Sequence, residues 1–174
     1  LKSLSVDYVI LGHSERRTIF GESSEFVRDK IDTVINQGIK AILCIGEALD
    51  ERRSGQTEKV LRNQLERSLN GISGINSDNF LLAYEPIWAI GTGNTATEVQ
   101  VAEAHAKIRS MVGNMLGKNG QNIPILYGGS VNVDNAGSLI DTNGVDGFLI
   151  GGASLDIESF CKIIELVTDN IKRG

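Results

Sequence analysis

The sequence has 174 residues, a formal net charge of −5, 41% apolar residues and 22% charged residues, which are ordinary values for one soluble globular domain. Acidic residues flank its arginine pairs, so it lacks the basic stripe expected of a nucleic-acid binder. Its apolar runs reach only four or five residues and no charged-then-apolar leader is present, so we expect no membrane partner and no secretory signal.

The first part of the chain predicts two strands separated by a helix. Residues 8–15 (YVILGHSE) and 41–48 (AILCIGEA) are apolar runs that end in small or polar residues, a pattern typical of strands buried on both faces. Between them, apolar residues recur on one helical face from Phe26 to Ile35. Gly38 follows where a left-handed C-cap belongs, so we expect the helix to end there.

The remainder of the chain predicts three more strands and two long helices. The strands are FLLAYEP (80–86), IPILYGGS (123–130) and GFLIGGAS (147–154). Thr97 and Gln100 form a capping box ahead of a helix that follows the first of these strands. The last helical pattern extends from Ile157 to Ile171.

Strand and helix alternate throughout, with steps of 24 to 43 residues between successive strand starts, which is the spacing of right-handed βαβ units in a parallel sheet. No linker divides residues 1–174, so we expect a single α/β domain. A doubly wound open sheet and a closed eight-stranded barrel both satisfy this pattern. Polar residues at the carboxyl end of every run favour the barrel, because a barrel gathers all strand ends around one axis.

Two polar side chains at strand ends are candidates for acid–base chemistry. Glu85 ends the third run among apolar neighbours, which would raise its pKa and suit a general base at neutral pH. A capping or salt-bridging role is the alternative for an isolated glutamate. His13 ends the first run, and the amides of a helix starting after it would keep its imidazole neutral and able to donate a hydrogen bond. A lone histidine at a strand end is more often structural, so the catalytic interpretation of His13 is supported only if it lies beside Glu85.

Glycine pairs end the last two strands, in Gly128-Gly129-Ser130 and in Gly151-Gly152-Ala153-Ser154. Backbone without a Cβ can approach a ligand closely, and amides at a following helix start suit an anion such as phosphate. One such pair is consistent with a plain turn. Two pairs after successive strands favour a phosphate site, because the loops after the last strands of this barrel class commonly form one.

The segment after Glu85 has the layout of a lid. Pro86, Ile87 and Trp88 form a stiff first hinge, Ala89, Ile90 and Gly91 form the tip, and Thr92, Gly93 and Asn94 form the second hinge. A loop that closes in this way excludes water and protects a reactive intermediate. Ordinary core filling is the alternative role for the tryptophan.

Metal and cofactor binding are not supported by the residues present. His13 and His105 lie far apart, and no cysteine or histidine stands at ligand spacing from either of them. No nucleotide-binding glycine motif lies between a strand and a helix. The two cysteines, Cys44 and Cys161, are typical of reduced thiols in a cytoplasmic protein. We therefore expect no metal and no cofactor.

The runs YVILGHSERR, AILCIGE, YEPIWAIGTG, ILYGGSV and DGFLIGGASL resemble, in this order, signatures of the triosephosphate isomerase family. The resemblance covers residues 6–172, and the ten-residue YEPIWAIGTG is highly specific. It implies a TIM (β/α)8 barrel that interconverts dihydroxyacetone phosphate and D-glyceraldehyde 3-phosphate through an enediolate. The reaction needs no cofactor and belongs to glycolysis and gluconeogenesis.

The resemblance also implies a role for each candidate residue. Glu85 is the base that moves a proton between two carbons, His13 is the neutral electrophile that polarises the carbonyl, and Glu15 orients the site. The phosphate would be held by backbone amides of Gly91, Ser130, Gly151 and Gly152. Supporting positions of the family are matched by Cys44, Glu47 and Tyr127.

The family's chains are barrel-sized, roughly 250 residues, whereas this sequence corresponds to strands 4–8 of the barrel. Residues 1–7 match the end of a preceding helix, and residues 8–174 match five βα units. Five strands cannot close a barrel of eight, so we expect the chain alone to be inactive. We expect it either to be a piece of a longer product or to depend on a complementary N-terminal piece, and the family homodimer is expected. Two alternatives stay open: an inactive fragment that keeps a phosphate-binding face, and another phosphate-binding barrel enzyme.

Overall fold

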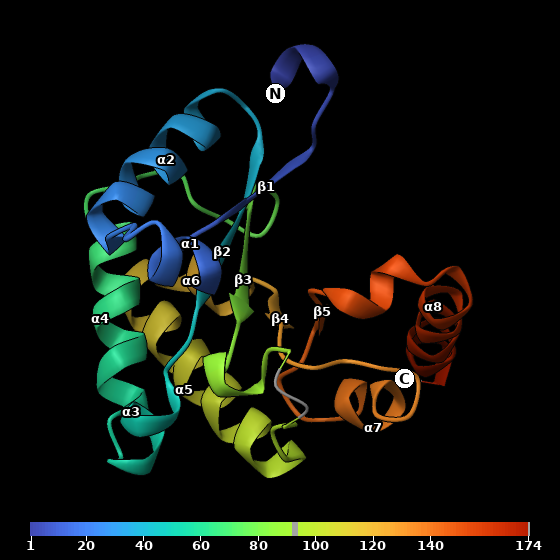
Figure 1. The fold of residues 1–174 in the computed structure, drawn as a ribbon. Coiled ribbons are helices and arrows are strands. Elements are labelled where there is room, and N and C mark those ends of the chain that lie inside the picture. The colour runs from blue at the N-terminus through green and yellow to red at the C-terminus, as the bar shows by residue number, and fades with distance from the viewer. Residues whose placement is uncertain (92–93, 174) are drawn as a thin grey trace.

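The computed structural model describes residues 1–91 and 94–173 (Figure 1). Its five parallel strands form one sheet in the order β1-β2-β3-β4-β5. The strands are β1 (Tyr8–Leu11), β2 (Lys40–Ile45), β3 (Phe80–Tyr84), β4 (Ile125–Tyr127) and β5 (Gly147–Phe148). The α-helices are α1 (Ser14–Ile19), α2 (Ser24–Asn36), α3 (Leu49–Arg53), α4 (Thr57–Leu69), α5 (Glu98–Leu116), α6 (Lys118–Gln121), α7 (Ala136–Ile140) and α8 (Ile157–Arg173). The short 3-10 helices are η1 (Lys2–Leu4), η2 (Ile87–Ala89) and η3 (Gly152–Leu155).

The strand order decides between the two predicted architectures. Each strand pairs with its neighbours in the chain, as Tyr8 does with Lys40 and Leu82 does with Ile125. Right-handed crossovers that always advance in one direction place their helices on the same face of the sheet. In Figure 1, α2, α4 and α5 lie along that face. A doubly wound sheet reverses its order at a switch point. This sheet does not, so the predicted barrel-type architecture is confirmed as an arc of five strands.

Local sequence signals set the ends of α2 and α5. After α2, Gly38 has a φ of 72°, and the amide of Ile39 donates to the carbonyl oxygen of Val34 over 3.1 Å. This pattern is the Schellman motif, which requires the left-handed residue that the sequence predicts here. Before α5, the amide of Gln100 donates to Thr97 over 3.3 Å, and the Gln100 side chain accepts from the Thr97 amide over 2.9 Å. The predicted C-cap and capping box are both confirmed.

The core lies between the sheet and helices α2, α4 and α5. Alternate strand residues point into this layer, and Leu43, Leu82 and Ile125 are fully buried in it. The opposite face of the sheet, called the inner face below, is more open. Ile10 and Ile42 are in register on it and both are partly exposed, Ile10 to 45%. The prediction that every run is buried on both faces is therefore wrong for β1, because nothing in the described residues covers its inner face.

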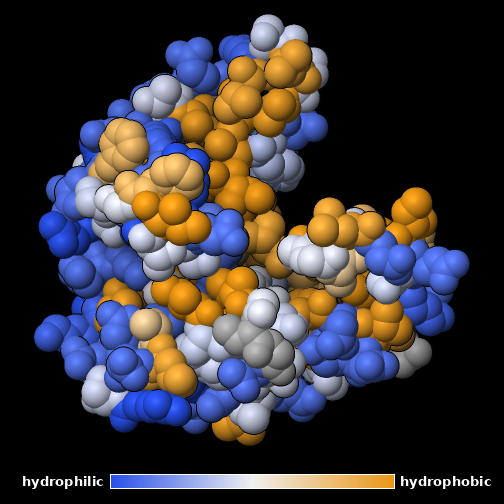
Figure 2. All heavy atoms as spheres, in the orientation of Figure 1, coloured by the Kyte–Doolittle hydropathy of each residue, from blue (hydrophilic) through white to orange (hydrophobic). Residues whose placement is uncertain are grey.

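The last predicted strand is also shorter than expected. Only Gly147 and Phe148 pair with β4, and the chain leaves the sheet before η3. As β5 lies at an edge, only one of its sides has ladder partners. Figure 2 shows a wide notch with apolar surface between the region of the N-terminus and that of α8. Where the sequence predicts the end of a helix, in residues 1–7, the chain forms η1.

Candidate active site

His13 is the N-cap residue of α1, the short helix that the sequence predicts after β1. The amide of Glu15 donates to Nδ1 of His13 over 3.3 Å. A ring nitrogen that accepts a hydrogen bond carries no proton, so the neutral imidazole holds its proton on Nε2. Nε2 lies 3.3 Å from Oε1 of Glu85. The start of α1 therefore selects a tautomer whose N–H points at the carboxylate.

Glu85 follows directly after β3 and is 2% exposed. The Ser14 amide donates to its Oε2 over 3.0 Å. Burial raises the pKa of Glu85, while the neighbouring His13 ring and the Ser14 amide oppose that shift. The raised pKa agrees with the sequence prediction of a partly enclosed carboxylate. A carboxylate whose pKa is raised is a stronger base than an exposed glutamate.

Two glycines make room for Glu85. A Cβ on Gly46 would lie 1.7 Å from the carbonyl oxygen of Glu85, a distance that the backbone cannot accommodate. A Cβ on Gly128 would lie 2.9 Å from Cγ of the same side chain. Gly128 belongs to the first predicted glycine pair, whereas the sequence analysis missed Gly46. Its only signal is its place at the end of the second run, and the need for a glycine comes from the adjacent strand.

A cavity of about 380 Å³ opens beside the two side chains, and both His13 and Glu85 line it. Its other walls come from the loops after β3, β4 and β5. All four residues predicted to hold a phosphate line this cavity: Gly91, Ser130, Gly151 and Gly152. Apolar residues that the sequence analysis did not single out complete the walls, among them Ile10, Val131 and Leu149. Segments far apart in the chain therefore meet at one place, as expected for the carboxyl ends of barrel strands.

Glu15 lies differently from the other predicted site residues. Its side chain is exposed and is not part of the cavity wall, and the contact with His13 comes from its main-chain amide. Ser14 contributes more directly, through the amide that binds Glu85. Sequence reasoning placed Ser14 at the strand end without giving it a role. The contact is made by the main chain, which any residue type could supply, so it leaves no signal in the sequence.

The first predicted hinge is anchored on a buried carboxylate. Glu47 is fully buried after β2 and accepts hydrogen bonds from Trp88 Nε1 at 3.2 Å and from Tyr84 Oη at 3.1 Å. Arg52 Nη1 pairs with it at 3.0 Å, and the Arg52 guanidinium also lies over the Trp88 ring, 5.3 Å from its centroid. The amide of Ile87 donates to the Glu47 carbonyl oxygen over 3.1 Å. The tryptophan is therefore held by specific polar contacts at the base of the loop, in addition to packing.

The predicted lid itself is described only in part. Pro86 is buried, residues 87–89 form η2, and Ile90 and Gly91 reach the cavity wall. Thr92 and Gly93, which belong to the predicted second hinge, lie outside the described residues. Of the described part of the lid, the predicted tip at Ile90 and Gly91 thus forms part of the wall of the cavity that Glu85 also lines.

The described residues contain neither a metal-binding cluster nor a membrane-spanning helix. Over residues 1–91 and 94–173, no group of three or more His, Cys, Asp or Glu side chains is arranged to hold a metal ion. In the same ranges, no helix has both the length and the apolar character needed to cross a membrane.

The fold and the site define a class of protein: a parallel α/β protein of the barrel type, with a histidine–glutamate pair and glycine-rich loops at the carboxyl ends of its strands. The sequence model of one family, described as triosephosphate isomerase, matches residues 1–167. The chain therefore belongs to the triosephosphate isomerase family.

Individual relatives agree with this membership. The chain is 48% identical over 163 residues to a triosephosphate isomerase from Oleidesulfovibrio alaskensis, covering 93% of this chain and 65% of that protein. It is 46% identical over 166 residues to one from Syntrophotalea carbinolica, covering 95% and 66%. A crystal structure of triosephosphate isomerase from Bartonella henselae superposes with a TM-score of 0.88 at 43% identity, covering 95% of this chain and 67% of that one. The chain thus spans just under two thirds of the length of the two sequence relatives.

Proposed function

We propose that this chain carries the reacting groups of a triosephosphate isomerase, which interconverts dihydroxyacetone phosphate and D-glyceraldehyde 3-phosphate. The observation that supports this most is the 3.3 Å contact between His13 Nε2 and Glu85 Oε1 at the wall of one cavity. A buried base and a neutral hydrogen-bond donor are what proton transfer next to a carbonyl requires.

The reaction follows from these two groups. Glu85 takes a proton from the carbon next to the carbonyl, and the C–H electron pair becomes the double bond of the enediolate. The Nε2–H of His13 donates a hydrogen bond to the oxygen on which negative charge develops. Protonated Glu85 then delivers its proton to the former carbonyl carbon. The hydroxyl proton on the other carbon moves to the former carbonyl oxygen by way of His13 Nε2, so the carbonyl forms again at the carbon that lost the first proton. No electrons leave the substrate, so the chemistry needs no redox cofactor.

The resting site must open before this reaction can occur. Oε1 of Glu85 faces His13, and Oε2 accepts from the Ser14 amide. A substrate that displaces these contacts could then interact with both the freed Glu85 carboxylate and the freed Nε2–H of His13. Because burial already raises the pKa of Glu85, removing a stabilising hydrogen bond raises its basicity further.

We assign the phosphate group of the substrate to the glycine-rich side of the cavity. Main-chain amides can reach a dianion closely where no Cβ intervenes. The residues are Gly91, Ser130, Gly151 and Gly152. In this proposal the lid from Pro86 to Thr92 closes over the substrate and keeps water from the enediolate. Trp88, held by Glu47, anchors its first hinge.

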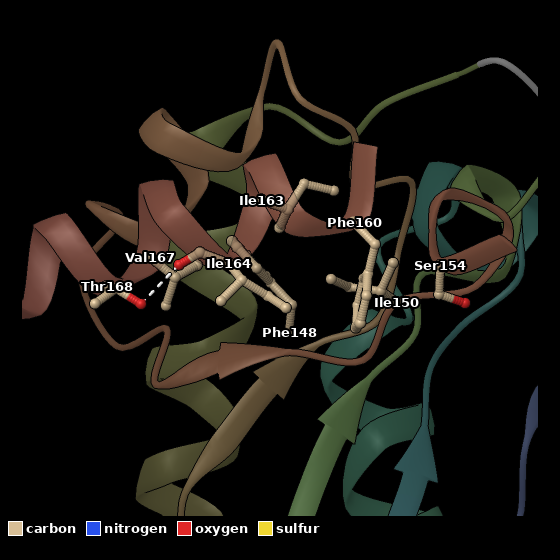
Figure 3. A pocket seen from close by; sticks show the side chains of 8 residues that line it. All are labelled: Phe148, Ile150, Ser154, Phe160, Ile163, Ile164, Val167 and Thr168. Atoms are coloured by element: carbon tan, nitrogen blue, oxygen red, sulfur yellow. Dashed lines mark hydrogen bonds between the residues drawn. The ribbon is translucent and has the colours of Figure 1, made fainter. Parts of the chain in front are cut away.

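The open edges of the sheet support a further part of the proposal. An apolar groove of about 350 Å³ lies between the β5 segment and α8, and Figure 3 shows the side chains that line it. Phe148 and Ile150 form one wall, and Phe160, Ile164 and Val167 of α8 form the other. At the far edge of the sheet, β1 exposes large apolar side chains on its inner face. Uncovered apolar grooves and unpaired edges of this kind favour association.

We therefore propose that strands corresponding to the first third of the relatives pair with both edges and close an eight-stranded barrel. They would come from a longer chain or from a separate piece. The completed barrels would then form the homodimer expected of the family. Two free cysteines, Cys44 and Cys161, support a reducing cytoplasmic setting for the proposed enzyme.

The test is an isomerase assay of the chain alone, of the chain mixed with the N-terminal third of the Oleidesulfovibrio alaskensis relative, and of a fusion of the two. Activity is expected only with the added segment. In the active form, Glu85→Gln should lower turnover by about 10²- to 10⁴-fold, which is the usual contribution of a positioned acid–base group. Glu66→Gln, an exposed substitution on α4, serves as the matched control.

Two results would contradict the proposal. Near-normal turnover of Glu85→Gln would exclude this residue as the base. A folded fusion that binds inorganic phosphate in the cavity but isomerises nothing would instead identify an inactive chain that keeps a phosphate-binding face.

A further inference from the structure

Arg17 joins three elements next to the reacting pair. Its side chain is half-buried on α1. Nε donates to the Gly12 carbonyl oxygen over 2.7 Å, Nη1 donates to Ser24 Oγ over 3.0 Å, and Nη2 donates to the Cys44 carbonyl oxygen over 3.4 Å. These partners lie after β1, at the start of α2 and near the end of β2. One guanidinium therefore fixes the relative positions of two strand ends and a helix.

The charge of Arg17 has no direct counter-ion. Its three hydrogen-bond acceptors are neutral oxygens, and no ion pair of Arg17 occurs within the described residues, although Arg16 and Lys30 both pair with Glu22. A guanidinium stays protonated in proteins, and enclosing a charge without a partner costs free energy. The presence of a charged arginine at this position indicates that its positive charge has a role that a neutral side chain could not fill.

Both contacts on the sheet side lead to the reacting residues. Gly12 precedes His13 and has a φ of 71°, which favours glycine, and a Cβ at this position would lie 2.7 Å from Arg17 Nη2. On the other strand, Cys44 lies near Glu85: burial and then the charge of Glu85 raise the pKa of its thiol. Arg17 thus contacts the main chain of one residue beside the imidazole and one beside the carboxylate.

We propose that Arg17 is a positioning residue: its guanidinium ties the His13 turn to the strand end beside Glu85, and its unneutralised charge favours the ionised form of Glu85. The catalytic meaning of this inference rests on the proposed function of Glu85 as the base. In the resting protein, the same charge opposes the effect of burial on the Glu85 carboxyl group.

The electrostatics agree with this geometry. Burial raises the pKa of Glu85, and the positive charge of Arg17 is among the influences that lower it. Burial lowers the pKa of Arg17 itself, while Cys44, Glu85 and Glu22 oppose that shift. The titratable groups facing Glu85 are therefore His13, Cys44 and Arg17, and of these only Arg17 is always positive.

The test measures the ionisation of Glu85 without requiring turnover. In protein labelled with ¹³C at the glutamate side-chain carboxyl, the signal missing from Glu85→Gln identifies Glu85. Removing the charge with Arg17→Gln should raise its pKa, because a nearby positive charge favours the ionised carboxylate. Arg17→Lys keeps the charge and should restore most of this shift. Arg62→Gln, which removes an exposed arginine, is the matched control.

An unchanged Glu85 pKa in folded Arg17→Gln would overturn the proposal, as would equal shifts in Arg17→Gln and Arg17→Lys. If Arg17→Gln does not fold, the Nε–H signal of Arg17 in the unsubstituted chain gives the answer. That signal should shift with pH at the Glu85 midpoint, and the response should vanish in Glu85→Gln. A signal that ignores this midpoint would refute the coupling. Absence of isomerase activity would affect only the proposed function, because neither measurement depends on it.

Discussion

Replacing Glu47 by glutamine tests the buried network at the base of the lid. The carboxylate is fully buried and is shared by Tyr84 Oη, Trp88 Nε1 and Arg52 Nη1, all within 3.0–3.2 Å. Glu47→Gln keeps the shape of the side chain and removes its charge. The Arg52 guanidinium then loses its counter-ion, and the new NH2 group competes with the donors that the carboxylate had accepted.

The expected cost follows from that burial. Removing one partner of a buried ion pair destabilises a protein by about 3–5 kcal/mol. The total stability of a domain is about 5–15 kcal/mol, so the loss is a large part of it. With a urea m-value of about 2 kcal/mol/M, the unfolding midpoint should fall by roughly 1.5–2.5 M.

Urea unfolding followed by far-ultraviolet circular dichroism measures this shift. Glu58→Gln is the control, because Glu58 pairs with Arg62 and Lys107 while its side chain is 50% exposed. Exposed pairs contribute less than about 1 kcal/mol each, so the control midpoint should move little. If Glu47→Gln moved the midpoint no further than Glu58→Gln does, the argument from the buried network would be wrong.

Three shorter predictions concern other parts of the core. Gly46→Ala should leave the protein unfolded or strongly destabilised in a thermal melt, since its Cβ would lie 1.7 Å from the Glu85 carbonyl oxygen; a normal melting temperature would contradict the close approach. Burial lowers the pKa of His105, so below about pH 6.5 the unfolded chain binds a proton that the folded chain does not bind. The free energy of unfolding should then fall by up to about 1.4 kcal/mol per pH unit. His105→Gln should flatten this pH dependence in urea titrations between pH 5 and 7. Burial raises the pKa of the Cys44 thiol, so a thiol reagent should modify exposed Cys161 at once and Cys44 only after unfolding; equal rates would refute the burial.

Short-range signals predicted much of this structure. The positions of Gly38 and of the Thr97–Gln100 pair determine helix ends through contacts within a few residues, and such contacts are legible in one sequence. The placement of His13 and Glu85 at strand ends also depends on local pattern, together with the rule that parallel strands bring their carboxyl ends to one side.

What escaped prediction depends on neighbours from other strands. No sequence signal near Gly46 indicates that the Glu85 backbone lies next to it in the folded chain. The hydrogen bond from the Ser14 amide is independent of residue type. The exposure of Ile10 on β1 has a similar origin, because an apolar run indicates a tendency to be buried and cannot name the partner that covers it.

The place of each strand in the sheet has a consequence for how the site responds to disturbance. Glu85 follows β3, the middle strand, which is hydrogen-bonded on both sides, whereas His13 follows β1, a marginal strand paired on one side. Fraying or mispairing at the edge of β1 should therefore displace the His13 imidazole before it displaces the Glu85 carboxylate. A molecule that binds along β1 would therefore shift His13 while Glu85 keeps its position.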